Sequence, residues 1–141
     1  MTGKTIDLEF EGCWREAYKA GVPARSGIYC VYSCTPSTVN GKTTLTLHKL
    51  IYIGESSNVR ARLASHNKLA DWSKHLEDGQ VLCYTVATVV GEDERFRAEA
   101  ALINKFTPPE NTEYVGNFPF NKTTVNCTGV ITYLLSTLTV E

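Results

Sequence analysis

The sequence predicts an α+β fold, in which a small central β-sheet is flanked by helices. Two segments rich in β-branched and aromatic residues, 27–34 and 44–54, flank an Asn-Gly pair that is typical of a two-residue hairpin turn. A near-continuous apolar stretch at residues 81–90 is typical of a further, buried strand. Residues 92–106 open with acidic residues and stop before two prolines, which is the pattern of a helix. A long hairpin, one further strand and flanking helices together define the fold class.

The chain has 141 residues, a length that suits one domain over 1–141. No repeat, linker or low-complexity segment divides it. The remaining elements are expected to be, in chain order, a short alternating strand (5–10), a short helix (11–21), a helix capped by Ser56 or Ser57 and ending near Leu69, a helix or turn (69–79), and a final strand (129–140).

The hairpin predicts its own register. If Asn40-Gly41 is the two-residue turn, facing residues in an unbroken ladder have numbers that sum to 81. Tyr29 then faces Tyr52, and two phenols stand side by side. Pro36 could force a bulge that slips this register by one residue.

Composition excludes several classes of protein. No apolar run reaches the roughly 20 residues of a membrane span, and no signal-peptide pattern opens the sequence, so no membrane association is expected. Five cysteines without a C-x-x-C pair argue against a disulfide framework or a structural zinc site. They indicate a reducing compartment, and we expect a cytoplasmic protein.

The charges are unevenly placed, although the net charge is only −1. Residues 42–74 hold six basic and two acidic residues, whereas residues 77–99 hold six acidic residues and two arginines. The basic segment could present one face to phosphates. Two ordinary solvated helix faces explain the same pattern equally well.

One residue of the predicted helix at 92–106 is out of place. Phe96, Ala100, Ile103 and Phe106 form its apolar stripe, and Glu99 lies on or beside this core-facing side. Burying an unpaired carboxylate is costly. Glu99 should therefore be paired with an arginine or hold a cation, and for this residue taken alone the ion pair is the more common arrangement.

Two tripeptides of the hairpin resemble the motif of a known family. Gly27-Ile28-Tyr29 followed by Tyr52-Ile53-Gly54 is similar to the motif that names the GIY-YIG nucleases. The family's catalytic arginine stands eight residues after the second glycine, which is the position of Arg62. Some members carry a histidine one turn later, which falls on His66.

The resemblance continues downstream. "EAALINKFTPPEN" is similar to the family's context for its metal-binding glutamate, and this similarity gives Glu99 and Asn111. The motifs span residues 27–111, and the extensions 1–26 and 112–141 remain unassigned.

The resemblance implies a DNA endonuclease that hydrolyses phosphodiester bonds with one Mg²⁺ or Mn²⁺ ion. Glu99 would be its only protein side-chain ligand. The resemblance also implies roles for the other residues. Tyr29 would be the general base or would position the attacking water, and Tyr52 would bind a phosphate or orient the water. Arg62 would contact the scissile phosphate, and Asn111 would support the site from outside its first layer of contacts.

His66 could accept the proton of Tyr29, serve as the base itself, or have a phosphate-binding or structural role. DNA contacts are expected from Arg60, Arg62 and Lys68. The alternative is a non-catalytic or partner-dependent DNA-binding module that keeps the GIY-YIG fold. The near-neutral charge favours a homodimer or a DNA-delivering partner protein over tight solitary binding.

Overall fold

The computed structural model describes residues 3–141 and confirms an α+β fold, with one six-stranded sheet in the order β3-β2-β4-β1-β5-β6. The sheet is larger than the expected hairpin with one further strand, because strands in both extensions, where the sequence also predicts strands, join it. The elements are β1 (Lys4–Arg15), the 3₁₀ helix η1 (Glu16–Gly21), β2 (Gly27–Val39), β3 (Lys42–Ser56), α1 (Val59–Ala64), α2 (Leu69–Ser73), β4 (Val81–Thr88), α3 (Glu92–Phe106), β5 (Thr123–Gly129) and β6 (Thr137–Val140).

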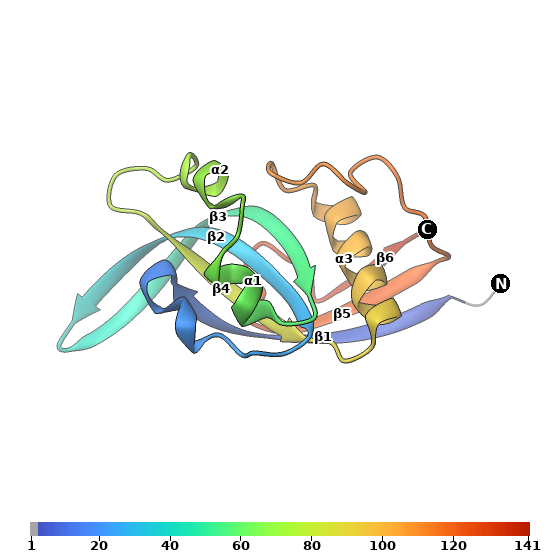
Figure 1. The fold of residues 1–141 in the computed structure, drawn as a ribbon, viewed down its shortest axis with the longest axis horizontal. Helices are drawn as coiled ribbons and strands as arrows, with labels where there is room; N and C mark the ends of the chain where they lie inside the picture. The colour runs from blue at the N-terminus through green and yellow to red at the C-terminus, as the bar shows by residue number, and fades with distance from the viewer. Residues whose placement is uncertain (1–2) are drawn as a thin grey trace.

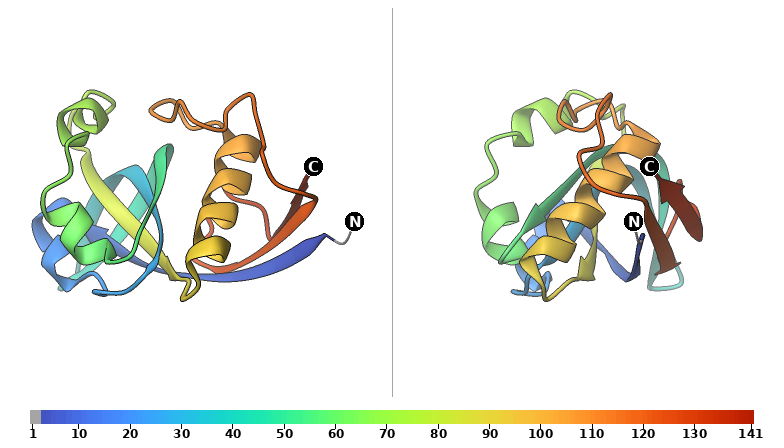
Figure 2. Two further views of the ribbon diagram at one scale, coloured as in Figure 1. Left: turned by 45° about the vertical axis from the view of Figure 1, so that its right-hand side comes forward. Right: turned by 90° about the vertical axis from the view of Figure 1, so that its right-hand side faces the viewer.

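The sheet is strongly twisted, and the hairpin β2–β3 extends from one end of it (Figure 1). The helices lie on different sides of the central strands: α1 and α2 cover one side and α3 covers the other (Figure 2). The alternation of side chains along β2 explains this arrangement. Ile28, Cys30 and Tyr32 join the apolar cluster that α3 covers, whereas Tyr29 and Val31 join the cluster beneath α1 and α2.

The register of the hairpin agrees with the prediction near the turn only. Six residue pairs keep the expected register, up to Cys34 and Leu47. Two bulges follow in β3, at His48 and Ile51, where the pairing shifts by one residue each time. Pro36 pairs in register, so the slip does not arise where the sequence suggested it.

The expected Tyr29–Tyr52 pair is therefore wrong. Tyr29 faces Gly54, and Tyr52 faces Val31. Because side chains alternate with a period of two residues, two slips of one residue return Tyr52 to the same face as Tyr29. The two rings still lie side by side, with their centroids 6.2 Å apart.

The N-terminal part differs most from the prediction. The helix expected at 11–21 is wrong, because β1 continues to Arg15 and only the 3₁₀ helix η1 follows. Pairing with β4 on one side and β5 on the other holds β1 in its extended form. The final strand expected at 129–140 is also wrong for most of its length, because only β6 forms there; β6 pairs with β5, which ends at Gly129.

The helix after Gly54 is shorter than expected. Its N-cap is Asn58, not Ser56 or Ser57, and the Asn58 side chain accepts a hydrogen bond of 3.1 Å from the Ala61 N–H. α1 ends at Ala64, and α2 begins only after a short loop. This loop contains His66, which is therefore released from the helix.

The bounds of α3 agree with the prediction, and its buried face agrees in part, because Ala100 and Ile103 are buried as expected. Phe96 is 37% exposed, whereas Arg95 and Ala98 are buried. Within residues 3–141, no helix has the length and apolar character that a membrane crossing requires.

Candidate active site

The two motif glycines are needed because other atoms approach them closely. A Cβ atom on Gly27 would collide with the backbone carbonyl oxygen of Ala87 in β4. A Cβ atom on Gly54 would collide with the ring and hydroxyl of Tyr29. The absence of a side chain at Gly54 thus allows the phenol of Tyr29 to lie across β3.

Tyr29 is buried beside Tyr52 and His66. Its side chain is only 1% exposed, and its Oη atom is 2.8 Å from Nε2 of His66. His66 follows α1, is 7% exposed, and has its ring centroid 4.3 Å from that of Trp72 in α2. Burial raises the pKa of Tyr29 above its ordinary value, so the phenol is protonated at neutral pH.

Tyr52 is the more accessible of the two motif tyrosines. It is half-buried, and its ring centroid lies 5.8 Å from that of His66. The Lys68 ammonium lies 5.9 Å from the same ring. Burial raises the pKa of Tyr52 most, and the negative charge of Glu99 raises it further.

The two arginines of α1 differ in their contacts. Arg62 is exposed, and its Nη2 donates a hydrogen bond of 3.3 Å to Oδ1 of Asn67. No carboxylate among residues 3–141 pairs with it. Nε of Arg60 donates to the carbonyl oxygen of Val22 at 2.6 Å, which leaves only its Nη groups for other partners.

Glu99 is half-buried in α3 and has no arginine partner among the described residues. The nearby Arg95 is instead paired with Glu55, at 2.6 Å. The ion pair with an arginine, which is the more common arrangement for a residue like Glu99 taken alone, is therefore not formed. Burial, followed by the charges of Glu55 and Glu113, raises the pKa of Glu99 to about 8. A bound cation would relieve this cost.

A small pocket of ≈ 60 Å³ connects several of the predicted residues. Tyr52, Lys68, Glu99, Asn111 and Glu113 are among the residues that line it. The structure therefore brings four predicted residues to one pocket.

Tyr29, Arg62 and His66 lie outside the lining of this pocket. Tyr29 and His66 contact the ring of Tyr52 from its buried side. The positive charge of Arg62 opposes the rise in the pKa of both tyrosines and lowers the pKa of His66.

The donor set around Glu99 suits a hard divalent cation, which prefers oxygen ligands. No group of three or more His, Cys, Asp or Glu side chains within residues 3–141 converges to hold a metal ion. Glu99 could hold such an ion, and the carboxylates of Glu110 and Glu113 line the same pocket.

Two features of the site have no clear signal in the sequence. Trp72 is fully buried and packs against both Tyr52 and His66. A lone tryptophan in a short amphipathic stretch looks like an ordinary core residue. The buried Arg95 forms an ion pair with Glu55. The two residues are 40 positions apart, so no sequence spacing predicts this pair.

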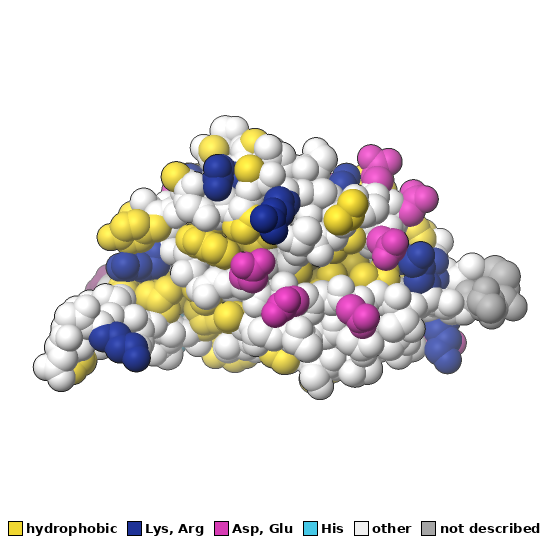
Figure 3. All heavy atoms as spheres, turned by 90° about the horizontal axis from the view of Figure 1, so that it is seen from below, with side chains coloured by type: hydrophobic (Ala, Val, Ile, Leu, Met, Phe, Trp, Pro, Cys, Tyr) yellow, Lys and Arg dark blue, Asp and Glu magenta, His cyan; other side chains and the backbone are white. Residues whose placement is uncertain are grey.

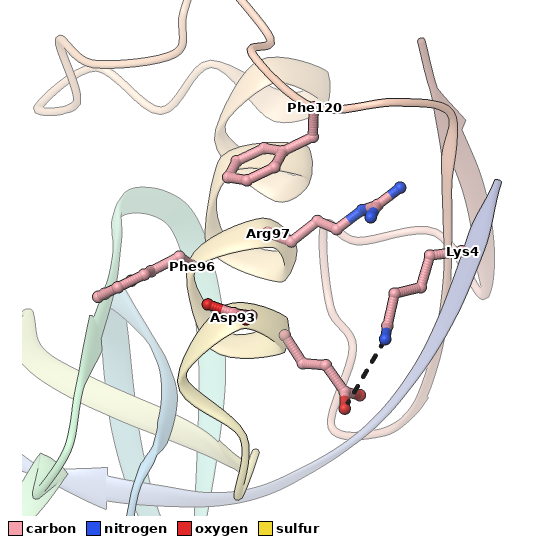
Figure 4. A pocket seen from close by; sticks show the side chains of 6 residues that line it. Lys4, Asp93, Phe96, Arg97 and Phe120 are labelled. Carbon is pink, nitrogen blue, oxygen red and sulfur yellow. Dashed lines mark ion pairs between the residues drawn. The ribbon is translucent and has the colours of Figure 1, made fainter. Parts of the chain in front are cut away.

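A larger pocket lies away from these residues, beside α3 and the first residues of β1 (Figure 4). It has a volume of ≈ 350 Å³ and contains none of the predicted site residues. Three of its four charged groups already have partners: Arg97 donates to Thr123 Oγ1 at 2.6 Å, and Lys4 lies 3.9 Å from Glu94. Arg97 and Glu99 are two positions apart, about 200° around a helix, so the two pockets lie on different sides of α3.

Comparisons with known proteins agree with the motifs. No family model matches the chain. UvrABC system protein C of Zymomonas mobilis subsp. mobilis is 26% identical over 92 residues, which are 64% of this chain but only 12% of that protein.

Two crystal structures are also similar to this chain: point mutants of the GIY-YIG N-terminal endonuclease domain of UvrC from Thermotoga maritima, each bound to the catalytic divalent cation of that domain. They are 22% and 21% identical to this chain and cover 67% of it and 91% of their own length, with a TM-score of 0.45 in each case. The chain is thus similar in sequence to a small part of a UvrC protein.

Proposed function

We propose that this protein is a metal-dependent DNA endonuclease that hydrolyses phosphodiester bonds through a GIY-YIG active site. The observation that carries the proposal is Glu99, a half-buried carboxylate without an arginine partner among residues 3–141, in one pocket with Tyr52. The sequence similarity to a UvrC protein agrees with this function.

Phosphodiester hydrolysis makes three demands on a site. A water molecule must be oriented and deprotonated, the extra negative charge on the phosphate must be stabilised, and the leaving oxygen needs an electrophile. A Mg²⁺ or Mn²⁺ ion held by Glu99 would supply the electrophilic chemistry when bound.

The residues around this carboxylate suit the other two demands. The exposed guanidinium of Arg62 can donate two hydrogen bonds to phosphate oxygens. Tyr52 lines the pocket and can orient water or bind a phosphate oxygen there. Asn111 braces the site through both backbone groups of Ile53.

DNA would approach over α1 and the loop before α2, where Arg60, Arg62 and Lys68 lie. On the face of the protein seen from below, the basic groups among the described side chains are scattered between acidic and apolar ones (Figure 3). With a net charge of −1, the protein would bind DNA weakly alone. A homodimer or a partner protein that delivers DNA would add contact surface for DNA.

The thiols of all five cysteines are free, which agrees with a cytoplasmic location.

The test is cleavage of supercoiled plasmid and of oligonucleotide duplexes, with Mg²⁺, with Mn²⁺ and with EDTA. We expect metal-dependent nicking that is lost in Glu99→Ala and in Arg62→Ala. Glu9→Gln, which changes an exposed carboxylate of β1, is the matched control and should retain activity. Cleavage that persists in Glu99→Ala would contradict the metal assignment, whereas DNA binding without cleavage in the unmodified protein would favour the non-catalytic or partner-dependent module.

A further inference from the structure

The hydrogen bonds of His66 determine which of its ring nitrogens carries the proton. Nδ1 lies 3.1 Å from the backbone nitrogen of Lys68, whose N–H points at it. A backbone N–H can only donate a hydrogen bond, so Nδ1 must be the acceptor and carries no proton. Nε2 lies 2.8 Å from the hydroxyl oxygen of Tyr29.

His66 is neutral under ordinary conditions. Burial, followed by the positive charges of Arg62 and Lys68, lowers its pKa to about 4. The titratable and charged groups that face it are Tyr29 in β2, Tyr52 in β3, Arg62 in α1 and Lys68 before α2. A neutral imidazole has one ring proton, and with Nδ1 excluded, that proton is on Nε2.

We infer that His66 is a positioning residue whose Nε2–H donates a hydrogen bond to Tyr29, so that the hydroxyl hydrogen of Tyr29 is offered to the substrate. The acceptor would be an oxygen of the scissile phosphate or of the attacking water. This inference deepens the proposed function and rests on it for the identity of the substrate. The tautomer itself rests only on the contacts of His66.

Two further observations agree with this assignment. Within residues 3–141, His66 and Arg62 are the side chains that reach the Tyr29 hydroxyl, and an arginine can only donate, so once Nε2 donates, the hydroxyl hydrogen has no protein acceptor there. The imidazole is also held in place, because it packs at 4.3 Å against Trp72 and edge-on to both tyrosines. A ring held this way cannot exchange its two nitrogens without disturbing the core beneath it.

The inference changes the role expected for His66. A histidine that takes the proton of Tyr29 needs an unprotonated Nε2, and this would place the ring proton on Nδ1, opposite the N–H of Lys68. Two donors would then face each other in a buried place. Tyr29 therefore acts as a hydrogen-bond donor, in agreement with the raised pKa of this phenol.

The tautomer can be measured without any activity. Protein labelled with ¹⁵N-histidine would be examined by long-range ¹H–¹⁵N correlation NMR near pH 7, and the signals of His66 assigned by their loss in His66→Gln. We expect a protonated Nε2 and an unprotonated Nδ1. A protonated Nδ1 would overturn the inference, whether or not the protein cleaves DNA.

Cleavage by two variants tests the role. The amide of His66→Gln can still donate to Tyr29 but cannot relay a proton, whereas His66→Ala does neither. We expect the rate of His66→Gln to fall less than about tenfold and that of His66→Ala to fall about a hundredfold, the scale of a lost catalytic group. Equal losses of about a hundredfold or more in both variants would show that His66 relays a proton and would overturn the positioning role.

Two controls complete this test. His48→Gln changes an exposed histidine of the hairpin and should cleave like the unmodified protein. Circular dichroism would show that both His66 variants are folded. If the unmodified protein cleaves no DNA, the proposed function fails, while the NMR result still decides the tautomer.

Discussion

Asn111 binds both backbone polar groups of Ile53 through its side-chain amide. The Ile53 N–H donates to Oδ1 at 3.0 Å, and Nδ2 donates to the Ile53 carbonyl oxygen at 2.9 Å. β3 is an edge strand of the sheet, so these groups would otherwise have no strand partner on that side. The amide of Asn111 therefore acts as a short piece of a neighbouring strand, and it joins the loop after α3 to the YIG tripeptide.

Asn111→Ala is expected to destabilise the protein by about 1 to 3 kcal/mol, because it leaves the N–H and the carbonyl oxygen of the buried Ile53 without these partners. Urea unfolding measures this loss. Asn117→Ala, in the exposed part of the same loop region, is the control and should change the free energy of unfolding by less than about 0.5 kcal/mol. Equal stability of the two variants would show that the Asn111 amide is not needed to satisfy the edge of β3.

Gly54→Ala is expected to destabilise the protein by about 1 to 3 kcal/mol, because the added methyl group would overlap the ring of Tyr29. Gly116→Ala is the matched control, since no atom lies within 4 Å of the position of its Cβ. The cost of Gly54→Ala should shrink in a Tyr29→Ala background, and thermal unfolding of the four proteins would give this coupling. Additive effects would contradict the close approach of ring and glycine.

The sequence predicted the elements whose signals are local. Residues 92–106 have a helical pattern with acids at the start and prolines beyond the end, and α3 has these bounds. The Asn-Gly turn likewise determines the hairpin near its tip. The motif glycines could also be recognised, although only the structure shows the close approaches that require them.

The remaining features depend on partners distant in the sequence. β1 continues to Arg15 because β4, which is distant in the chain, pairs with its residues 10–15. The bulges at His48 and Ile51 have no local signal, yet together they preserve the face on which Tyr52 lies. His66 leaves α1 for the loop where it meets Tyr29, a contact across 37 positions. The candidate residues could therefore be proposed from the sequence, but their contacts could not be predicted from it.

Substitution of Arg60 is expected to lower mainly the stability of the protein, and substitution of Arg62 mainly its cleavage activity. Arg60→Ala removes the hydrogen bond to the Val22 carbonyl and should cost about 1 kcal/mol of stability. It should lower cleavage less than about tenfold, as the loss of one phosphate contact does at moderate salt. Arg62→Ala should leave stability within about 0.5 kcal/mol and lower cleavage by about a hundredfold or more.

Unfolding in urea and single-turnover cleavage, measured on both arginine variants, would test this separation. Arg97→Ala is a useful third variant, because Arg97 binds Thr123 on a different side of α3 from Glu99. It should lose stability without losing cleavage in conditions where it is folded. A loss of activity in Arg60→Ala as large as that in Arg62→Ala would contradict the proposal that Arg62, and not Arg60, contacts the scissile phosphate.

Glu99 is expected to make stability depend on pH when no metal ion is bound. Its pKa is about 8 in the folded protein, against an ordinary value of 4.5, so the folded state holds this proton more tightly than the unfolded state. Stability should therefore fall as pH rises from about 4.5 to about 8, because unfolding then releases a proton. Urea unfolding in EDTA across this range would measure the slope.

Glu99→Gln removes the titrating group and should flatten this slope, while Glu9→Gln, which changes an exposed carboxylate, should keep it. Because a divalent cation binds the ionised carboxylate, added Mg²⁺ or Mn²⁺ should stabilise the unmodified protein more at pH 8 than at pH 5. The same ions should have little effect on Glu99→Gln at either pH. Equal pH slopes with and without the Glu99 carboxylate would show that it is not buried at this cost, and the electrostatic argument for a cation at this position would be lost.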